Sequence, residues 1–260
     1  MRIALLLFFF LQYTTLFAVK RDTVFIKDPK DAQKVLMRVT DLNTGNLLEE
    51  GIIYSGRKEG IWRTYFDNKI LSGITEYQNG RRNGIALTFA SDASVLTEEY
   101  YVDDLKEGLI RKFSRTHKIK EESHYRQGIL HGIQYIYNND GKLQEQAHYT
   151  SGIRDSLNTW YYPSGKMMVQ YMYAKNNLNG LSKSFYDSGQ IKAEGSFKEA
   201  KEDGEWKYFY ENGKIKESGL FVNGIKTGIW TLYNDQGDGE KTQEFKDGIL
   251  VKEKIITPKK

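Results

Sequence analysis

Four histidines are the side chains of this sequence best suited to hold a metal ion: His117, His124, His131 and His148. A metal site needs three or four ligands that converge to about 2 Å. His124 and His148 stand 24 residues apart, at equivalent positions of the repeat described below. In neighbouring hairpins their backbones would lie roughly 9–10 Å apart. We therefore expect surface histidines and no metal site. The chain has no Cys, which excludes disulfides, thiolate ligands and a Cys nucleophile.

Carboxylates recur along the chain and could in principle serve a glycosidase, which needs two of them about 5–10 Å apart in a cleft. The recurring residues are Glu98, Glu121, Glu122, Glu145, Glu194 and Glu217. Nothing marks one pair out, and a repeating carboxylate is typical of a solvated row paired with lysines. The sequence has no nucleophile elbow and no phosphate-binding glycine loop that opens a helix. We expect no catalytic residue, no cofactor and no enzyme.

The charge balance gives no general attraction to nucleic acid. The chain has 38 basic and 34 acidic residues among 260, for a formal net charge of +4. A nucleic-acid surface needs a basic stripe interleaved with stacking aromatics, whereas here Glu is interspersed among scattered Lys and Arg. The composition, with 18 Tyr, 24 Gly and only 3 Pro, indicates strands joined by tight turns.

The elements that position these side chains repeat every 24 residues without interruption from Gly45 to Gly248. A turn column reads Gly60, Gly84, Gly108, Gly132, Ser156, Gly180, Gly204 and Gly228. An aromatic column follows it at Tyr65, Phe89, Phe113, Tyr137, Tyr161, Phe185, Phe209 and Tyr233. A second column precedes it at Ile53, Tyr77, Tyr101, Tyr125, Tyr149, Tyr173, Phe197, Phe221 and Phe245. The segments between turns suit strands and are too short for helices, so each repeat is predicted to be a β-hairpin.

The expected fold is all-β: an elongated antiparallel meander of about eight 24-residue hairpins, or about 16 strands. An aliphatic column holds Ile61, Ile85, Leu109, Ile133, Leu157, Leu181, Glu205 and Ile229. If no bulge intervenes, parity places this column and both aromatic columns on one face, as a buried ladder. Stacked neighbours would then stabilise hairpins that are marginal alone.

The expected organisation has four parts. Residues 1–18 resemble a secretory signal, with Arg2, a short apolar run and the small residue Ala18 at the cleavage position. The alternative is a membrane anchor, but a span needs about 20 apolar residues. Residues 19–44 are expected to be a lead or cap, 45–252 the repeat array and 253–260 a tail. Lys252, Glu253 and Lys254 in the last strand would discourage edge-to-edge pairing. We expect an extracytoplasmic mature chain, periplasmic or secreted.

Two phrases carry a family resemblance. They are Gly-x-x-x-Gly-Ile-Trp-x-x-Tyr, at Gly56 to Tyr65 and Gly224 to Tyr233, and Tyr-x-Asn-Gly-Lys-Ile at Tyr210 to Ile215. Over residues 45 to about 250 the chain resembles the variant MORN repeat of bacterial proteins named for the YwqK antitoxin family. The resemblance implies an elongated sheet of β-hairpins that makes protein or lipid contacts and has no catalysis of its own. It also suggests an alternative role, an antitoxin or immunity-type protein that masks a toxin.

Parity places five aromatic residues on the face opposite the ladder: Trp62, Trp160, Trp206, Tyr208 and Trp230. An exposed aromatic patch often marks a binding site, so these are candidate partner-binding residues, but packing within the fold is the role we expect first for these positions. The sequence as a whole predicts an exported, non-enzymatic repeat protein. It would present a rigid sheet as a binding or scaffold surface to another protein or an envelope component.

Overall fold

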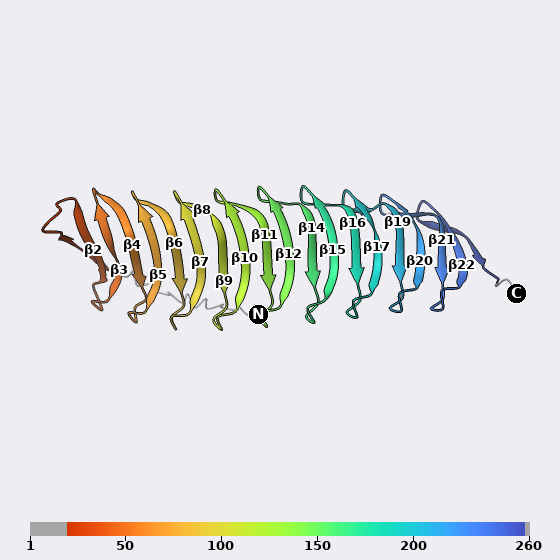
Figure 1. The fold of residues 1–260 in the computed structure, drawn as a ribbon, viewed down its shortest axis with the longest axis horizontal. Helices are drawn as coiled ribbons and strands as arrows, with labels where there is room; N and C mark the ends of the chain where they lie inside the picture. Colours follow the sequence, from red (N-terminus) through yellow and green to blue (C-terminus); the bar gives the residue numbers. More distant parts are fainter. Residues whose placement is uncertain (1–19, 258–260) are drawn as a thin grey trace, which may run out of the picture.

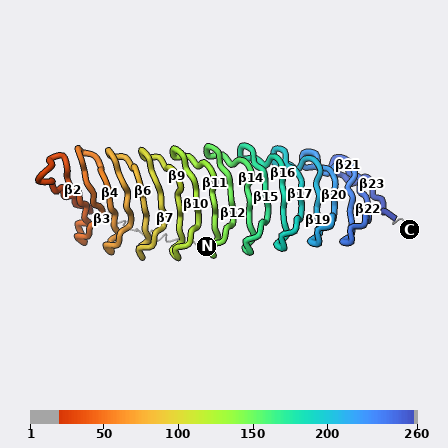
Figure 2. Tube along the Cα trace, viewed as in Figure 1, coloured from red at the N-terminus to blue at the C-terminus, as the bar shows by residue number. Residues whose placement is uncertain are grey.

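The computed structural model describes residues 20–257, and within them it forms one 23-stranded antiparallel sheet. The strands stack side by side along one long axis, from β2 near one end to β22 and β23 at the other (Figure 1, Figure 2). Successive strands pair with each other, except that the short strands β8, β13 and β18 and the strands after them share one partner, so the prediction of an all-β hairpin meander is confirmed. None of the described residues forms a helix long and apolar enough to cross a membrane.

The strands keep the spacing of the sequence repeat. The first half contains β1 (Arg21–Lys27), β2 (Lys34–Asp41), β3 (Leu47–Tyr54), β4 (Arg57–Tyr65), β5 (Leu71–Gln78), β6 (Arg81–Phe89), β7 (Val95–Val102), β8 (Leu105–Lys106), β9 (Gly108–Phe113), β10 (Ile119–Arg126), β11 (Ile129–Tyr137) and β12 (Leu143–Thr150). The second half contains β13 (Ile153–Arg154), β14 (Ser156–Tyr161), β15 (Met167–Ala174), β16 (Asn177–Phe185), β17 (Ile191–Lys198), β18 (Lys201–Glu202), β19 (Gly204–Phe209), β20 (Ile215–Val222), β21 (Ile225–Tyr233), β22 (Gly239–Lys246) and β23 (Ile249–Ile255).

Two-residue turns close the hairpins along one long edge of the sheet. In the hairpin of β20 and β21, Val222 pairs with Ile225, and Asn223 and Gly224 have φ of 51° and 81°. Two positive φ angles are the mark of a type I′ turn, whose twist matches that of the strands. The turn glycines also link one hairpin to the one before, as where the Gly224 N–H donates to the Glu202 carbonyl at 2.8 Å.

A bulge follows each of these turns. In β20 and β21 the pairing jumps from Leu220 with Thr227 to Ser218 with Thr231, so three residues of β21 face the single residue Gly219. Gly228, at the centre of the bulge, has φ of 64°. The glycine column of the sequence is therefore required here by a left-handed backbone that other side chains adopt only with strain.

The ends of the array differ from the repeat. The segment expected as a lead or cap contains β1 and β2, which extend the sheet, and β23 reaches Ile255. The expected signal segment, residues 1–18, lies outside the described residues. The strand segments exceed the expected 16 because three rungs are split, as β8 and β9 are, and because strands are added at both ends.

Candidate binding faces of the sheet

The two faces of the sheet carry different side chains, and the hairpin turn decides which side chain lies where. Directly opposed residues of an antiparallel pair share a face. Because Val222 pairs with Ile225, and Phe221 with Lys226, an odd-numbered residue of β20 shares its face with even-numbered residues of β21. We call the face of Phe221 and Trp230 the aromatic face. The opposite face, with Leu220 and Ile229, is the open face.

This geometry corrects the predicted single ladder. The prediction assumed that odd-numbered residues stay on one face throughout the chain, which placed the column of Phe221 with that of Ile229. A two-residue turn instead pairs an even-numbered residue, Val222, with an odd-numbered one, Ile225, so odd numbers change face between the two strands. The aromatic column that contains Phe221 therefore lies with the tryptophans. The aliphatic column and the other aromatic column lie together on the open face, where the Tyr65 and Tyr137 hydroxyls donate to Glu50 and Glu122 at 2.9 Å each.

The aromatic face is filled by the protein's own rings. Phe221 meets Trp230 edge to face, with 4.9 Å between ring centroids, and Phe197 meets Trp206 likewise at 5.3 Å. The Trp230 ring covers Gly219: a Cβ built on this glycine would lie 2.2 Å from the ring. Gly195 lies under Trp206 in the same way. Each Trp here needs a glycine on the facing strand, because the sheet leaves no room for a second side chain.

Polar groups complete the packing of this face. The Trp230 indole N–H donates to the Leu220 carbonyl at 3.2 Å. The Lys226 ammonium lies 3.8 Å from the Trp230 ring centroid and forms an ion pair with Glu217. Lys58 repeats the arrangement, 3.9 Å from the centroid of its own Trp and paired with a carboxylate at 2.7 Å. A Lys ammonium over a Trp ring, paired with a carboxylate, stabilises the packing of this face. These charges therefore serve the fold.

The middle repeats replace Trp with polar side chains that bond to one another. The Gln134 amide donates to Ser123 Oγ at 3.0 Å and to Glu121 at 3.2 Å. Asn158 accepts from the His148 backbone N–H at 3.1 Å and donates to two carbonyls. No buried side-chain N or O of the described residues lacks a partner. These side chains are therefore part of the scaffold.

The shifted pKa values on the aromatic face belong to side chains that are hydrogen-bonded to each other, as Glu99 and Tyr101 are. Burial opposes ionisation of Glu99, but hydrogen bonds from Lys106 and Tyr101 outweigh it and hold the pKa of Glu99 below its ordinary value. Burial and the hydrogen bond to Glu99 raise the pKa of Tyr101 to about 12. On the open face, burial and Glu122 raise the pKa of Tyr137 to about 12. Each shift is explained by a local structural pair, so none marks a catalytic group.

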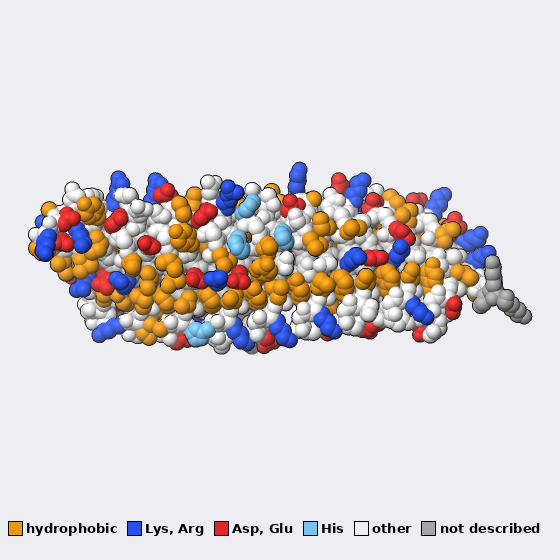
Figure 3. Space-filling model, in the orientation of Figure 1, with side chains coloured by type: hydrophobic (Ala, Val, Ile, Leu, Met, Phe, Trp, Pro, Cys, Tyr) orange, Lys and Arg blue, Asp and Glu red, His pale blue; other side chains and the backbone are white. Residues whose placement is uncertain are grey.

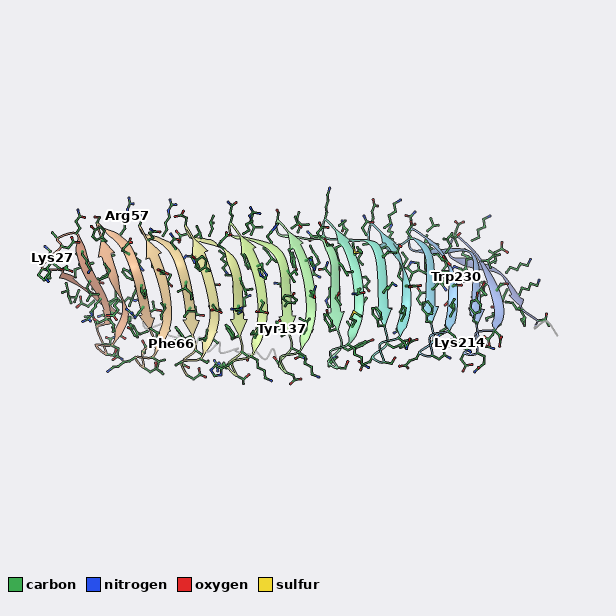
Figure 4. The ribbon with its side chains drawn as sticks, in the orientation of Figure 1. Lys27, Arg57, Phe66, Tyr137, Lys214 and Trp230 are labelled. Carbon is green, nitrogen blue, oxygen red and sulfur yellow. The ribbon has the colours of Figure 1, made fainter. Side chains whose placement is uncertain are left out.

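The predicted exposure of the five candidate aromatic residues is wrong. Trp62, Trp206 and Trp230 are 2%, 6% and 0% exposed, and Trp160 and Tyr208 are half-buried. They lie with the aromatic column because of the parity inversion at the turn. Figure 4 shows Trp230 on the sheet between the turns of Arg57 along one long edge and those of Lys214 along the other. Partner contact by these five residues stays a prediction, and their role in the fold is packing.

The open face carries an exposed row of aliphatic side chains. We call this the aliphatic row: Ile61, Ile85, Leu109, Ile133, Leu157, Leu181, Glu205 and Ile229. Ile61, Leu181 and Ile229 are 49%, 67% and 65% exposed, while Leu109 and Ile133 are half-buried. The prediction that this row lies inside the buried ladder is wrong, because the two-residue turn inverts parity. Figure 3 shows hydrophobic side chains, aromatic and aliphatic together, along the long axis of one face, with acidic and basic side chains beside them.

A charged row runs beside the aliphatic row on the same face. Arg111 lies between two carboxylates, at 3.1 Å from Glu98 and 3.0 Å from Glu122. Lys183 pairs with Glu194 at 3.3 Å in the second half of the array. These ions are partly exposed and arranged by the cross-strand register. They add little stability, but they give the open face a fixed pattern of charge beside its apolar row.

The open face has a shallow depression of about 290 Å³ where small residues interrupt it. Its lining is Leu181, Ser182, Lys183, Glu194, Gly195, Ser196, Glu205 and Lys207. Ser196 lies directly opposite Leu181 and leaves one side of this exposed leucine uncovered. Sequence reasoning missed the depression; the pairing of a small residue with the aliphatic row is the signal that could have found it.

Within residues 20–257, no group of three or more His, Asp or Glu side chains is placed to hold a metal ion. His124 Nδ1 lies 2.9 Å from the Ile133 carbonyl, and His131 Nδ1 accepts from the Ser151 N–H at 3.4 Å. The recurrent carboxylates are held by Lys or Arg, as Glu121 is by Lys112 at 2.8 Å. The arrangement supports binding through the open face.

These observations define the class of protein: an extended array of β-hairpins, with one face filled by its own rings and the other open. The family model described as "MORN repeat variant" matches residues 58–79, 130–150, 154–175, 178–199 and 202–223. Five segments of the chain are therefore variant MORN repeats, as the sequence resemblance predicted. All-β arrays of this kind are typically non-catalytic.

No curated protein matches the chain. The chain is similar to three solved structures at low identity. "Crystal Structure of TarM" is 15% identical, over 48% of this chain and 19% of that one, with a TM-score of 0.23. "Crystal Structure of TcdB2-TccC3-Cdc42" is 12% identical, over 80% and 13%, with a TM-score of 0.21. A porin-like protein from Bacteroides uniformis ATCC 8492 is 9% identical, over 90% and 93%, with a TM-score of 0.16. With TM-scores this low, none of the three indicates a fold or a function for this chain.

Proposed function

We propose that this chain is a non-catalytic binding protein that presents its open face to a protein partner outside the cytoplasm. The observation that carries the proposal is the exposed aliphatic row, because the tryptophans of the opposite face are buried against glycines of the facing strands. Exposed apolar side chains gathered on one face are a feature of interaction sites, and here they alternate with residues of the neighbouring strands such as His124 and Glu244. The charged row beside it supplies a polar border of the kind that fixes orientation in protein interfaces.

The expected partner surface is apolar along one line and charged along its border. The depression beside Leu181 is the best place for an anchoring side chain, since an interface usually concentrates its binding energy in a few side chains set into pockets. Lys183 and Lys207 face Glu194 and Glu205 around it, so both signs of charge are within reach of a partner.

The test is capture of partners from envelope extract by the purified chain and by two matched variants. In the first, Leu157, Leu181 and Ile229 are replaced by Ser, which removes exposed apolar side chains from the aliphatic row. The control replaces exposed aliphatic residues at the hairpin turns instead: Leu105, Ile129 and Ile153. We expect the first variant to lose a captured protein that the control retains. Because the control residues lie on the same face beside the turns, equal capture by both variants would remove the aliphatic row as the binding surface.

Export is tested separately. If residues 1–18 direct secretion, the chain isolated from cell fractions will begin near Val19 and lie outside the cytoplasm. Mass spectrometry of the intact chain gives its first residue, and fractionation gives its compartment. A full-length chain confined to the cytoplasm would contradict this part of the proposal and leave the binding face to be judged by the capture experiment.

A further inference from the structure

The two outer strands of the sheet each have one unpaired side. Among the described strands, β1 pairs only with β2, and β23 only with β22. All seven residues of each are exposed. A row of free backbone N–H and C=O groups on an edge strand is a template for another strand. The question is which strand fits.

The direction of the strands fits a second copy of the chain. Successive strands alternate in direction, and β8, β13 and β18 share a rung with β9, β14 and β19. When each split strand is counted once with the strand that continues it, the 23 described strands form 20 strand positions. Because this number is even, β1 and β23 point in opposite directions. A second copy shifted along the axis would place its β1 antiparallel to β23, which continues the meander without a change of pairing type.

The free backbone groups of both edges also fit. In β1, the Lys20 carbonyl accepts from the Leu42 N–H at 2.8 Å, so even-numbered residues point inward and odd-numbered ones, such as Arg21, point out. Near the end of β23, the Ile256 N–H donates to the Glu240 carbonyl at 2.8 Å, so Glu253 points out. Odd-numbered residues of the two edges can therefore form hydrogen-bonded pairs with each other.

One such register matches charge on both faces. With Arg21 opposite Glu253, the next pair is Asp22 opposite Lys252. Arg21 lies on the aromatic face, since Phe25 of the same strand pairs with Met37 and Met37 with Gly51. Glu253 lies on that face too, because it pairs with Gln243, which pairs with Trp230. Asp22 and Lys252 then share the open face, and both of these pairs join opposite charges, while Lys20 falls opposite Lys254 at the end of the strand.

The same charges oppose pairing between like edges. Two copies of β23 paired about Glu253 would place Glu253 against Glu253 and Lys252 against Lys254. Like charges directly opposite each other destabilise a strand pair. Lys252, Glu253 and Lys254 therefore oppose pairing of β23 with a second β23, as predicted from the sequence, but Glu253 and Lys252 are complementary to Arg21 and Asp22 of β1. Glu253 already accepts from Lys241 at 3.1 Å and is 42% exposed, which leaves room for a second cation.

We propose that this chain associates head to tail with copies of itself, β1 of one copy adding to β23 of the next in the register of Arg21 with Glu253. An interface of this kind joins two different surfaces and does not close on itself, so it builds a longer sheet from identical units. The aliphatic row would then continue from copy to copy. The proposal does not depend on what the open face binds.

Single-cysteine chains test the register directly, because the natural chain has no Cys. Chains carrying Asp22→Cys and Lys252→Cys are mixed under mild oxidation, and the products are separated by mass without reductant. Residues at a non-hydrogen-bonded pair lie close enough for a disulfide. We expect a disulfide between the two chains in high yield, and much less when Lys254→Cys replaces Lys252→Cys. Equal yields, or only pairs of identical chains, would overturn the register.

Charge exchange tests the association itself. Sedimentation velocity over a range of concentrations measures the assembly of the full chain, with circular dichroism to verify its strand content. We expect Glu253→Arg to weaken association about fivefold, and the double variant Arg21→Glu/Glu253→Arg to restore it. A natural chain that stays monomeric at every concentration, or a double variant as weak as the single one, would overturn the proposal. Because neither variant alters the aliphatic row, this failure is distinct from a failure of partner capture.

Discussion

The contact between Gly219 and Trp230 can be measured as a coupling energy. Ala at position 219 would place its Cβ 2.2 Å from the Trp230 ring, so the ring must move by more than about 1 Å to restore ordinary contact. The ring cannot move freely, since Phe221 lies 4.9 Å away between centroids and Lys226 lies 3.8 Å from the ring centroid. Overpacking of this kind costs about 1–3 kcal/mol. Since Trp230 is fully buried, we expect the upper end of this range.

The sign should reverse when the ring is absent. Trp230→Ala alone should cost about 3–5 kcal/mol. In that background, Gly219→Ala should stabilise the strand by roughly 0.5–1 kcal/mol, because Ala loses less backbone entropy than Gly. The two substitutions should therefore couple by about 3–4 kcal/mol, well above the additivity error of distant sites.

The assay is urea unfolding of the full chain followed by circular dichroism. Repeat arrays can lose cooperativity, so amide hydrogen exchange of β20 and β21 should be measured beside it. Gly195→Ala is the matched control, because Gly195 lies under Trp206 and should couple far less to Trp230→Ala. If Gly219→Ala costs the same with and without the Trp230 ring, the assignment of this glycine to ring packing is refuted.

Three further predictions follow from the same geometry. The pKa of Tyr101 is raised from 10.0 to about 12, so its contribution to stability is complete below pH 10 and is lost as the pH rises to 12. Ultraviolet titration of the Tyr101→Phe variant beside the natural chain should show the loss of one tyrosine that ionises late. Ile229→Ser should change the free energy of unfolding by less than about 0.5 kcal/mol, since this side chain is 65% exposed; thermal unfolding checks it, and a larger loss would mean that the aliphatic row is a core. Deletion of residues 205–228 removes one period and places Trp230 opposite Gly195, whereas deletion of residues 181–204 places Trp206 opposite Tyr171. Circular dichroism should show a stable sheet only for the first deletion. Equal stability of the two would argue against size matching across the hairpin.

The sequence predicts the repeat, the hairpins and the register of the turns, because each depends on local chemistry. Asn223 and Gly224 adopt positive φ for reasons that are visible in the residues themselves. The sequence fails at the assignment of faces, which depends on how two strands pair across a turn. Residue spacing along the chain does not show that Val222 pairs with Ile225. Because of this pairing, the tryptophans lie on the face of Phe221, where the prediction had placed the aliphatic row.

The failure has a second physical source, the similarity of aromatic and aliphatic columns as apolar patterns. Both faces of this sheet carry aromatic residues, but a large ring covers the facing strand only where that strand supplies Gly or another small residue. Gly219 under Trp230 and Ser182 opposite Tyr171 show the same size matching in two hairpins with different residues. Pairing of large with small residues across each hairpin therefore identifies the filled face, and the periodic column without such partners is the one left for binding.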